Sequence, residues 1–109
     1  MSSKLRVGIV GASGWMAGAL AAGIEYDEAG FQDGEGVKSE VSVVSALCDL
    51  NAEALTARQS ELRLEEATLY SSYADMLASD NVDAVVVAVP NKLHVDFAIK
   101  ALEAGKHLF

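Results

Sequence analysis

The chain has 109 residues, enough for one domain, and 51% of them are hydrophobic, which favours a folded protein and excludes a disordered one. Its net charge of −8, from 16 acidic and 8 basic residues, repels nucleic acids and anionic membranes and argues against both as partners. A single cysteine, an N-terminus without an apolar leader and the lack of any long apolar stretch predict a cytoplasmic protein without disulfides or membrane helices.

The first predicted element is a short apolar strand, Leu5–Val10, which leads into the glycine-rich turn Gly11–Gly14 and then into an alanine-rich helix, Trp15–Ile24. A strand, a glycine turn and a helix N-terminus in this order present backbone N–H groups to a phosphate. Gly14 has no side chain to block a pyrophosphate. The spacing departs from G-x-G-x-x-G because Ser13 and Met16 replace two glycines, so an ordinary strand-to-helix turn is the alternative.

Strands and helices alternate along the rest of the chain. Further strands are predicted over Val41–Cys48, Leu69–Ser71, Val82–Val89 and Lys106–Phe109, and further helices over Ala52–Leu62, Tyr73–Ala78 and Lys92–Ala104. Asn51 and Asn91 are predicted N-caps, Gly105 a helix stop, and the acidic, glycine-rich residues 25–40 a surface loop. This alternation is typical of an α/β fold, here a doubly wound parallel sheet of Rossmann type with about five strands, truncated at the fifth.

Ligands of such sheets bind beyond the carboxyl ends of the strands, where this chain places several polar residues. Asp49 follows the second strand, and its carboxylate can accept two hydrogen bonds from the adenosine ribose while repelling a 2′-phosphate, which favours NAD over NADP. A helix-capping aspartate is the alternative for Asp49. Asn91 and His94 follow a later strand and can face the nicotinamide, or can be a cap and a partly exposed helix residue. No metal-ligand spacing and no Ser-His-Asp set is found.

Several segments resemble, in chain order, the N-terminal domain of a known dehydrogenase family. They are Val7-Gly8-Ile9-Val10-Gly11, Cys48-Asp49-Leu50-Asn51-Ala52-Glu53, Tyr73-Ala74-Asp75-Met76-Leu77, and Pro90-Asn91-Lys92-Leu93-His94 followed by Ala98 to His107. The last block, P-N-x-x-H and then A-L-x-A-G-K-H, is the most specific. The family is that of glucose–fructose oxidoreductase and inositol dehydrogenase (Gfo/Idh/MocA), whose members depend on a nicotinamide cofactor.

The resemblance implies roles for ten residues in binding NAD. Gly11, Ser13, Gly14, Trp15 and Met16 would line the pyrophosphate turn, Asp49 would bind the adenosine ribose, and Ala88, Pro90, Asn91 and His94 would surround the nicotinamide and its ribose. It also implies an NAD(P)-dependent dehydrogenase that moves hydride between the cofactor and a sugar or polyol. A semialdehyde-forming reductase, which also opens with Gly-Ala-Ser-Gly and an aromatic residue, is disfavoured by the P-N-x-x-H block.

By the same resemblance, residues 1–109 are the dinucleotide-binding domain alone. The family's E-K-P lysine and its second, substrate-binding domain are not found in this sequence, so we expect the chain alone to be inactive, with His94 as its one candidate catalytic residue. The alternative is a stand-alone dinucleotide-binding or sensor module without catalysis. The exposed edge of the last strand also allows a homo-oligomer.

Overall fold

The computed structural model describes residues 4–12, 24, 42–64, 66–89 and 91–108. The predicted helix over Trp15–Ile24 lies outside this part of the chain except for Ile24, which is helical, and the predicted loop over residues 25–40 also lies outside it. Ile24 packs against the core, and its carbonyl accepts a 2.5 Å hydrogen bond from the hydroxyl of Ser42.

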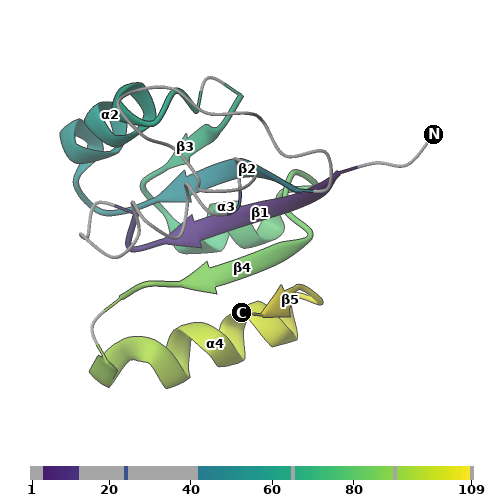
Figure 1. Cartoon of the computed structure of the whole chain (residues 1–109). Helices are drawn as coiled ribbons and strands as arrows, with labels where there is room; N and C mark the ends of the chain where they lie inside the picture. The colour runs from purple at the N-terminus through teal and green to yellow at the C-terminus, as the bar shows by residue number, and fades with distance from the viewer. Residues whose placement is uncertain (1–3, 13–23, 25–41, 65, 90, 109) are drawn as a thin grey trace.

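Within the described part of the chain, five parallel strands form one sheet. They are β1 (Leu5–Val10), β2 (Ser42–Cys48), β3 (Thr68–Tyr70), β4 (Ala84–Val87) and β5 (His107–Leu108), and they lie side by side in the order β3-β2-β1-β4-β5 (Figure 1). From β1 the chain therefore adds β2 and β3 towards one edge of the sheet, and then returns to add β4 and β5 on the other side of β1. This confirms the doubly wound parallel α/β sheet that the alternation predicted.

The point where the sheet changes direction lies beside β1. Val10 at the carboxyl end of β1 pairs with Cys48 of β2 on one side and with Val87 of β4 on the other. Because all the strands are parallel, their carboxyl ends meet at one edge of the sheet. In folds of this kind the crevice at such a switch point receives the ligand.

Helices cover both faces of the sheet, and each face has its own hydrophobic core. Helix α2 (Ala52–Glu61) buries Leu55 against Ile9 and Leu47 on one face. Helices α3 (Tyr73–Ala78) and α4 (His94–Glu103) pack on the other face, where Met76 and Ala101 join a second cluster. Burial on both faces explains why β1 and β4 are almost continuous apolar runs.

The element boundaries differ from the predictions at several places. Helix α4 starts at His94 rather than Lys92 because the 3₁₀ turn η1 (Asn91–Leu93) precedes it, so the cap predicted at Asn91 is wrong and Leu93 holds that position without a side-chain cap bond. Strand β4 is shorter than the predicted Val82–Val89, and β3 starts one residue early. The predicted cap at Asn51 is confirmed, since its side chain accepts a hydrogen bond from Ala54 N at 3.0 Å.

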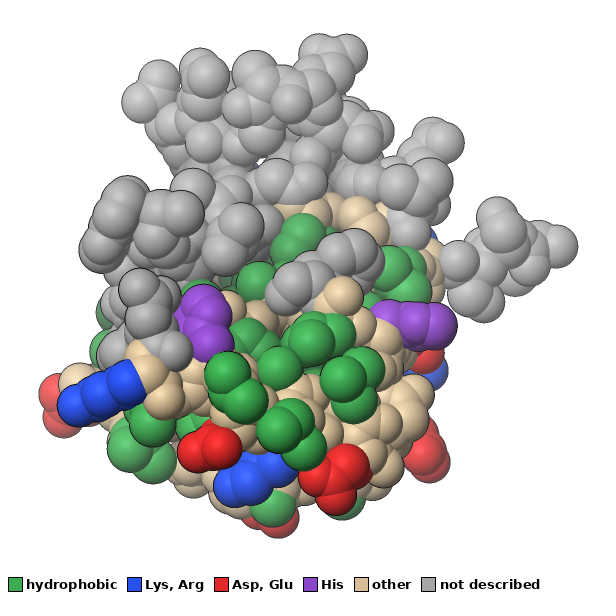
Figure 2. All heavy atoms as spheres, turned by 90° about the horizontal axis from the view of Figure 1, so that it is seen from below, with side chains coloured by type: hydrophobic (Ala, Val, Ile, Leu, Met, Phe, Trp, Pro, Cys, Tyr) green, Lys and Arg blue, Asp and Glu red, His purple; other side chains and the backbone are tan. Residues whose placement is uncertain are grey.

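The outer face of α4 is apolar. Val95, Ile99 and Leu102, spaced four and three residues apart and therefore on one side of the helix, are 67%, 48% and 58% exposed. Seen from below the sheet, hydrophobic side chains gather on this side of the molecule, with acidic and basic groups around them (Figure 2). Gly105 follows the helix with a φ of +78°, and Lys106 N bonds back to Ala101 O, so the predicted glycine stop is confirmed.

Candidate functional site

The turn after β1 depends on a glycine at position 11. Gly11 has a φ of +82°, and a Cβ built there would lie 2.9 Å from the carbonyl carbon and oxygen of Ala88. The N–H groups of Gly11 and Ala12 both donate to the Cys48 carbonyl, at 2.9 and 3.1 Å. A residue with a side chain would be strained in this conformation and would push β4 away. The sharp turn predicted at Gly11 is therefore present, and it is attached to β2 and β4.

Asp49 lies directly beyond the carboxyl end of β2. Its backbone N–H donates to the Tyr70 carbonyl at 3.1 Å, which ties it to the end of β3. Its carboxylate oxygen Oδ1 accepts a 3.1 Å hydrogen bond from Asn51 N, and the N-cap of α2 is Asn51. An ionised carboxylate can accept about four hydrogen bonds, so Asp49 brings a strong acceptor group to this end of the sheet.

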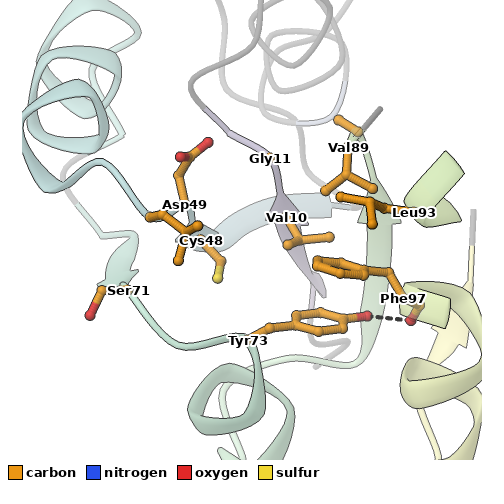
Figure 3. Close-up of a pocket in the computed structure, with 11 residues that line it drawn as sticks. Val10, Gly11, Cys48, Asp49, Ser71, Tyr73, Val89, Leu93 and Phe97 are labelled. Carbon is orange, nitrogen blue, oxygen red and sulfur yellow. Dashed lines mark hydrogen bonds between the residues drawn. The ribbon is translucent and has the colours of Figure 1, made fainter. Parts of the chain in front are cut away.

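A pocket of about 350 Å³ opens at this edge of the sheet, over the ends of β1, β2 and β4. Figure 3 shows Asp49 and Cys48 on one side of it, Val89, Leu93 and Phe97 facing them from the other, and Val10 and Gly11 between. Leu50, Ser71, Tyr73 and Ala88 complete the lining. A mostly apolar pocket of this size with one carboxylate at its rim can hold a flat, uncharged ring attached to a group that donates hydrogen bonds.

Two stacked rings form a wall of the pocket. The rings of Tyr73 from α3 and Phe97 from α4 lie 4.7 Å apart between centroids at an interplanar angle of 12°, and the Tyr73 hydroxyl donates to the Phe97 carbonyl at 2.7 Å (Figure 3). Burial raises the pKa of Tyr73 to about 12, with the nearby Cys48 thiol adding to the shift. The hydroxyl therefore stays protonated and holds the two helices together, rather than acting as a base at neutral pH.

Cys48 lines the same pocket as a buried, free thiol. Burial is the main cause that raises its pKa to about 11, and the negative charge of Asp49 adds to it. A thiol in this state is a weak nucleophile. Cys48 therefore serves the pocket as a small apolar side chain.

The segment between β4 and α4 forms the other rim. The N–H of Ala88 donates to the Val10 carbonyl at 2.9 Å, and the ring nitrogen Nε2 of His94 lies 2.5 Å from the Val89 carbonyl. A carbonyl oxygen can only accept, so Nε2 carries the hydrogen in this contact. His94 thus holds the start of α4 to the segment that follows β4.

Four of the ten residues predicted to bind the cofactor lie in the described structure with their side chains, and three of them, Gly11, Asp49 and Ala88, line the pocket. The fourth, His94, contacts its rim through Val89. For Asn91 only the backbone is described, and it lies in η1. Ser13, Gly14, Trp15, Met16 and Pro90 lie outside the described residues, and their roles stay predictions.

The apolar side chains that give the pocket its shape were not predicted from the sequence. Leu50 is 92% exposed at the rim, and Leu93 and Phe97 face it from the far side. A leucine directly after the aspartate predicted to bind the ribose was the available signal for Leu50. The described residues contain no group of three metal-binding side chains and no helix long and apolar enough to cross a membrane.

Comparison with known proteins places this geometry in a family. The profile of the Gfo/Idh/MocA oxidoreductase family, described as an NAD-binding Rossmann fold, matches residues 5–109. A D-xylose 1-dehydrogenase (NADP(+)) from Haloferax volcanii is 36% identical over 81 residues, which cover 69% of this chain and 25% of the relative.

Two solved structures have the same fold. The WlbA dehydrogenase of Bordetella pertussis, in complex with NADH and UDP-GlcNAcA, is 34% identical, has a TM-score of 0.75, and is matched over 97% of this chain and 28% of its own. The myo-inositol dehydrogenase of Lactobacillus casei, in complex with NAD(H) and myo-inositol, is 25% identical with a TM-score of 0.77, over 98% of this chain and 28% of its own. The chain therefore spans little more than a quarter of the length of these two proteins.

Proposed function

This chain belongs to the Gfo/Idh/MocA oxidoreductase family and is its NAD-binding Rossmann domain, and from that premise we propose that it binds NAD(H) for a dehydrogenase acting on a sugar or polyol. The observation that carries the proposal is the Asp49 carboxylate at the rim of an apolar pocket beside the Gly11 turn. A nucleoside has the matching chemistry, because its ribose donates hydrogen bonds and its base is flat and weakly polar.

The adenosine half of the cofactor fits this pocket. The ribose hydroxyls would donate to Asp49, and the adenine would lie among Leu50, Leu93 and Phe97. The diphosphate would then reach the turn that follows β1, where the absence of a side chain at Gly11 leaves the backbone close to β4. We place Ser13, Gly14, Trp15 and Met16 along the diphosphate, as the resemblance implies.

The nicotinamide half would extend past the end of β4. Ala88, Pro90, Asn91 and His94 would surround it, with His94 holding the rim through the Val89 carbonyl. When bound, the nicotinamide carries the hydride. The work of this chain is to bind the cofactor, orient its ring and keep water from the β-strand ends.

The substrate would be held by residues outside these 109. Inositol, xylose and UDP-sugar dehydrogenases among the relatives support a polyol or sugar, in which a hydroxyl-bearing carbon exchanges hydride with the cofactor. We place the proton acceptor for that hydroxyl in the same part of the enzyme, together with the second domain. A buried free thiol at Cys48 accords with the cytoplasmic location expected from the sequence, and the edge strand β5 accords with a homo-oligomer.

We propose a preference for NAD(H) over NADP(H), since the Asp49 carboxylate would repel a 2′-phosphate. The test is a titration of the chain with NADH and with NADPH, in which binding is monitored by the fluorescence of the cofactor. Asp49→Asn keeps the Oδ1 that accepts from Asn51 N and removes the charge. This substitution should weaken the binding of NADH about ten-fold and reduce the difference in affinity between NADH and NADPH.

The matched control is Asp80→Asn. Asp80 is an exposed aspartate that precedes β4 and so lies at the opposite edge of the sheet. Its replacement should change neither affinity. Equal affinities of the unmodified chain for the two cofactors, or an unchanged preference in Asp49→Asn, would contradict the role given to Asp49.

A further inference from the structure

Arg58 of α2 reaches back to the turn after β1. Its Nε donates to the Ala12 carbonyl at 3.1 Å, and its Nη1 forms a 3.0 Å ion pair with Glu61 one helical turn further along. The Arg58 side chain is 16% exposed, whereas that of Glu61 is 62% exposed. Arg58 is therefore a mostly buried guanidinium whose forked end joins a helix to a turn that lies 46 residues earlier in the sequence.

The contact falls on Ala12, the last residue of the turn that the structure describes. The N–H groups of Gly11 and Ala12 are held by the Cys48 carbonyl, and the Ala12 side chain is fully buried. The carbonyl of Ala12 accepts a hydrogen bond from Arg58 Nε. A hydrogen bond on this carbonyl therefore restrains the backbone at Ala12 from the side of α2.

Arg58 also brings a positive charge to this turn. The chain has a net charge of −8, and Asp49 places a carboxylate at the neighbouring strand end, so an approaching diphosphate meets a negative field. The charge of Glu61 is screened by solvent more than that of Arg58 because of their difference in exposure. The guanidinium thus lies beside the turn that the proposed diphosphate would approach.

We propose that Arg58 is a positioning residue for the cofactor's diphosphate, acting through the Ala12 carbonyl and through its own charge. The inference rests on the proposed binding of NAD(H) beyond β1. It separates the two ends of the adenosine half: Asp49 recognises the ribose, and Arg58 prepares the turn for the phosphates.

The experiment compares ligands with and without phosphates. The unmodified chain, Arg58→Met and Arg58→Lys are titrated with NADH, and ADP and adenosine are then measured by displacement of the bound NADH. Arg58→Met keeps the length of the aliphatic stem and removes both the hydrogen bond and the charge. Arg58→Lys keeps the charge but not the forked geometry. Arg63→Met, at an exposed arginine after the end of α2, is the matched control for a lost charge.

Arg58→Met should weaken the binding of NADH and of ADP by roughly ten-fold and change the affinity for adenosine by less than about two-fold. Arg58→Lys should be intermediate, and Arg63→Met should match the unmodified chain. A general loss of packing would weaken the binding of adenosine as much as that of ADP. Equal losses of affinity for the two ligands would therefore overturn the inference. Full recovery in Arg58→Lys would overturn the positioning role, because charge alone would then suffice. Failure of the unmodified chain to bind NADH would instead refute the proposed function itself.

Discussion

Gly11 and Gly105 have nearly the same positive φ, +82° and +78°, in very different surroundings. A Cβ at Gly11 would lie 2.9 Å from the Ala88 carbonyl, whereas a Cβ at Gly105 would meet nothing within 4 Å. The two positions therefore separate the strain of a left-handed conformation from the effect of a steric clash with backbone.

We expect Gly105→Ala to lower the free energy of unfolding by about 1 kcal/mol, the strain of the conformation alone. Gly11→Ala should lower it by about 2–4 kcal/mol, because β4 must also move. Urea unfolding followed by circular dichroism measures both values. Equal losses in the two variants would mean that the close approach of Gly11 to Ala88 does not stabilise the fold.

Cys48 permits a second test at the residue scale. Since burial raises the pKa of its thiol to about 11, we expect little reaction with iodoacetamide at pH 8 in the folded chain and rapid reaction once urea unfolds it. The rate of labelling should follow the unfolding curve. Labelling of the folded chain as fast as a free thiol would show that the pocket wall is open at Cys48.

Single residues could be predicted from the sequence where the backbone conformation or a charge requires a particular residue type. Gly11 and Asp49 follow strands at fixed positions, so their places could be derived from the strand pattern. The stacking of Tyr73 on Phe97 could not, because it joins side chains of two helices that meet only through the fold. The same is true of Arg58, whose partner Ala12 lies 46 residues away in the sequence.

At the scale of elements, α4 combines a buried and an exposed apolar face. Ala101 is fully buried against the sheet, and the next residue, Leu102, is 58% exposed. The hydrophobic pattern predicted a helix here, but its start was wrong by two residues. The 3₁₀ turn η1 depends on how the chain leaves β4, which a helical period does not reveal.

These neighbouring positions give a matched pair of substitutions. Ala101→Leu should lower the free energy of unfolding by about 1–3 kcal/mol, because the larger side chain must fit between α4 and the sheet. Leu102→Ala should lower it by less than about 1 kcal/mol, since most of that side chain is already in water. Thermal unfolding of the two variants checks the order. A larger loss of stability in Leu102→Ala than in Ala101→Leu would mean that Leu102, rather than Ala101, packs against the sheet.

At the scale of the whole molecule, Arg6 and Asp83 fasten β1 to the segment before β4. The Arg6 guanidinium donates to both carboxylate oxygens of Asp83, at 3.2 and 3.0 Å, and the backbone N–H of Arg6 donates as well, at 2.9 Å. The Asp83 N–H returns a 2.7 Å bond to the Arg6 carbonyl. The hydrogen bonds from Arg6 hold the pKa of Asp83 below its ordinary value of 3.8.

This lowered pKa makes part of the stability depend on pH. The contribution of ionised Asp83 is complete above the ordinary carboxyl pKa of about 4 and is lost as the pH falls through the lower value of the folded state. We expect Asp83→Asn to be less stable than the unmodified chain at pH 7, with the difference shrinking below about pH 4. Urea unfolding between pH 2.5 and pH 7 measures it. A difference that stays constant over this range would rule out the ion pair as its cause.

The alternation of strands and helices made the architecture predictable, because parallel strands joined by helices pack in few ways. The edges of the elements were less predictable. Strand β4 is shorter than its apolar run because the chain turns towards η1 after Val87, although the Ala88 N–H still donates to the Val10 carbonyl. Of the residues that line the pocket, Gly11, Asp49 and Ala88 were predicted, whereas Leu50, Leu93 and Phe97 were missed, since apolar side chains carry no motif.

The central claim is that this chain holds the adenosine half of NAD between Asp49 and the Gly11 turn. A crystal structure of the chain grown with NAD tests it most directly. The account predicts the ribose hydroxyls within hydrogen-bonding distance of Asp49, the adenine against Leu50 and Phe97, and the diphosphate at the turn after β1. A dinucleotide bound at another edge of the sheet, or one whose ribose makes no contact with Asp49, would contradict it.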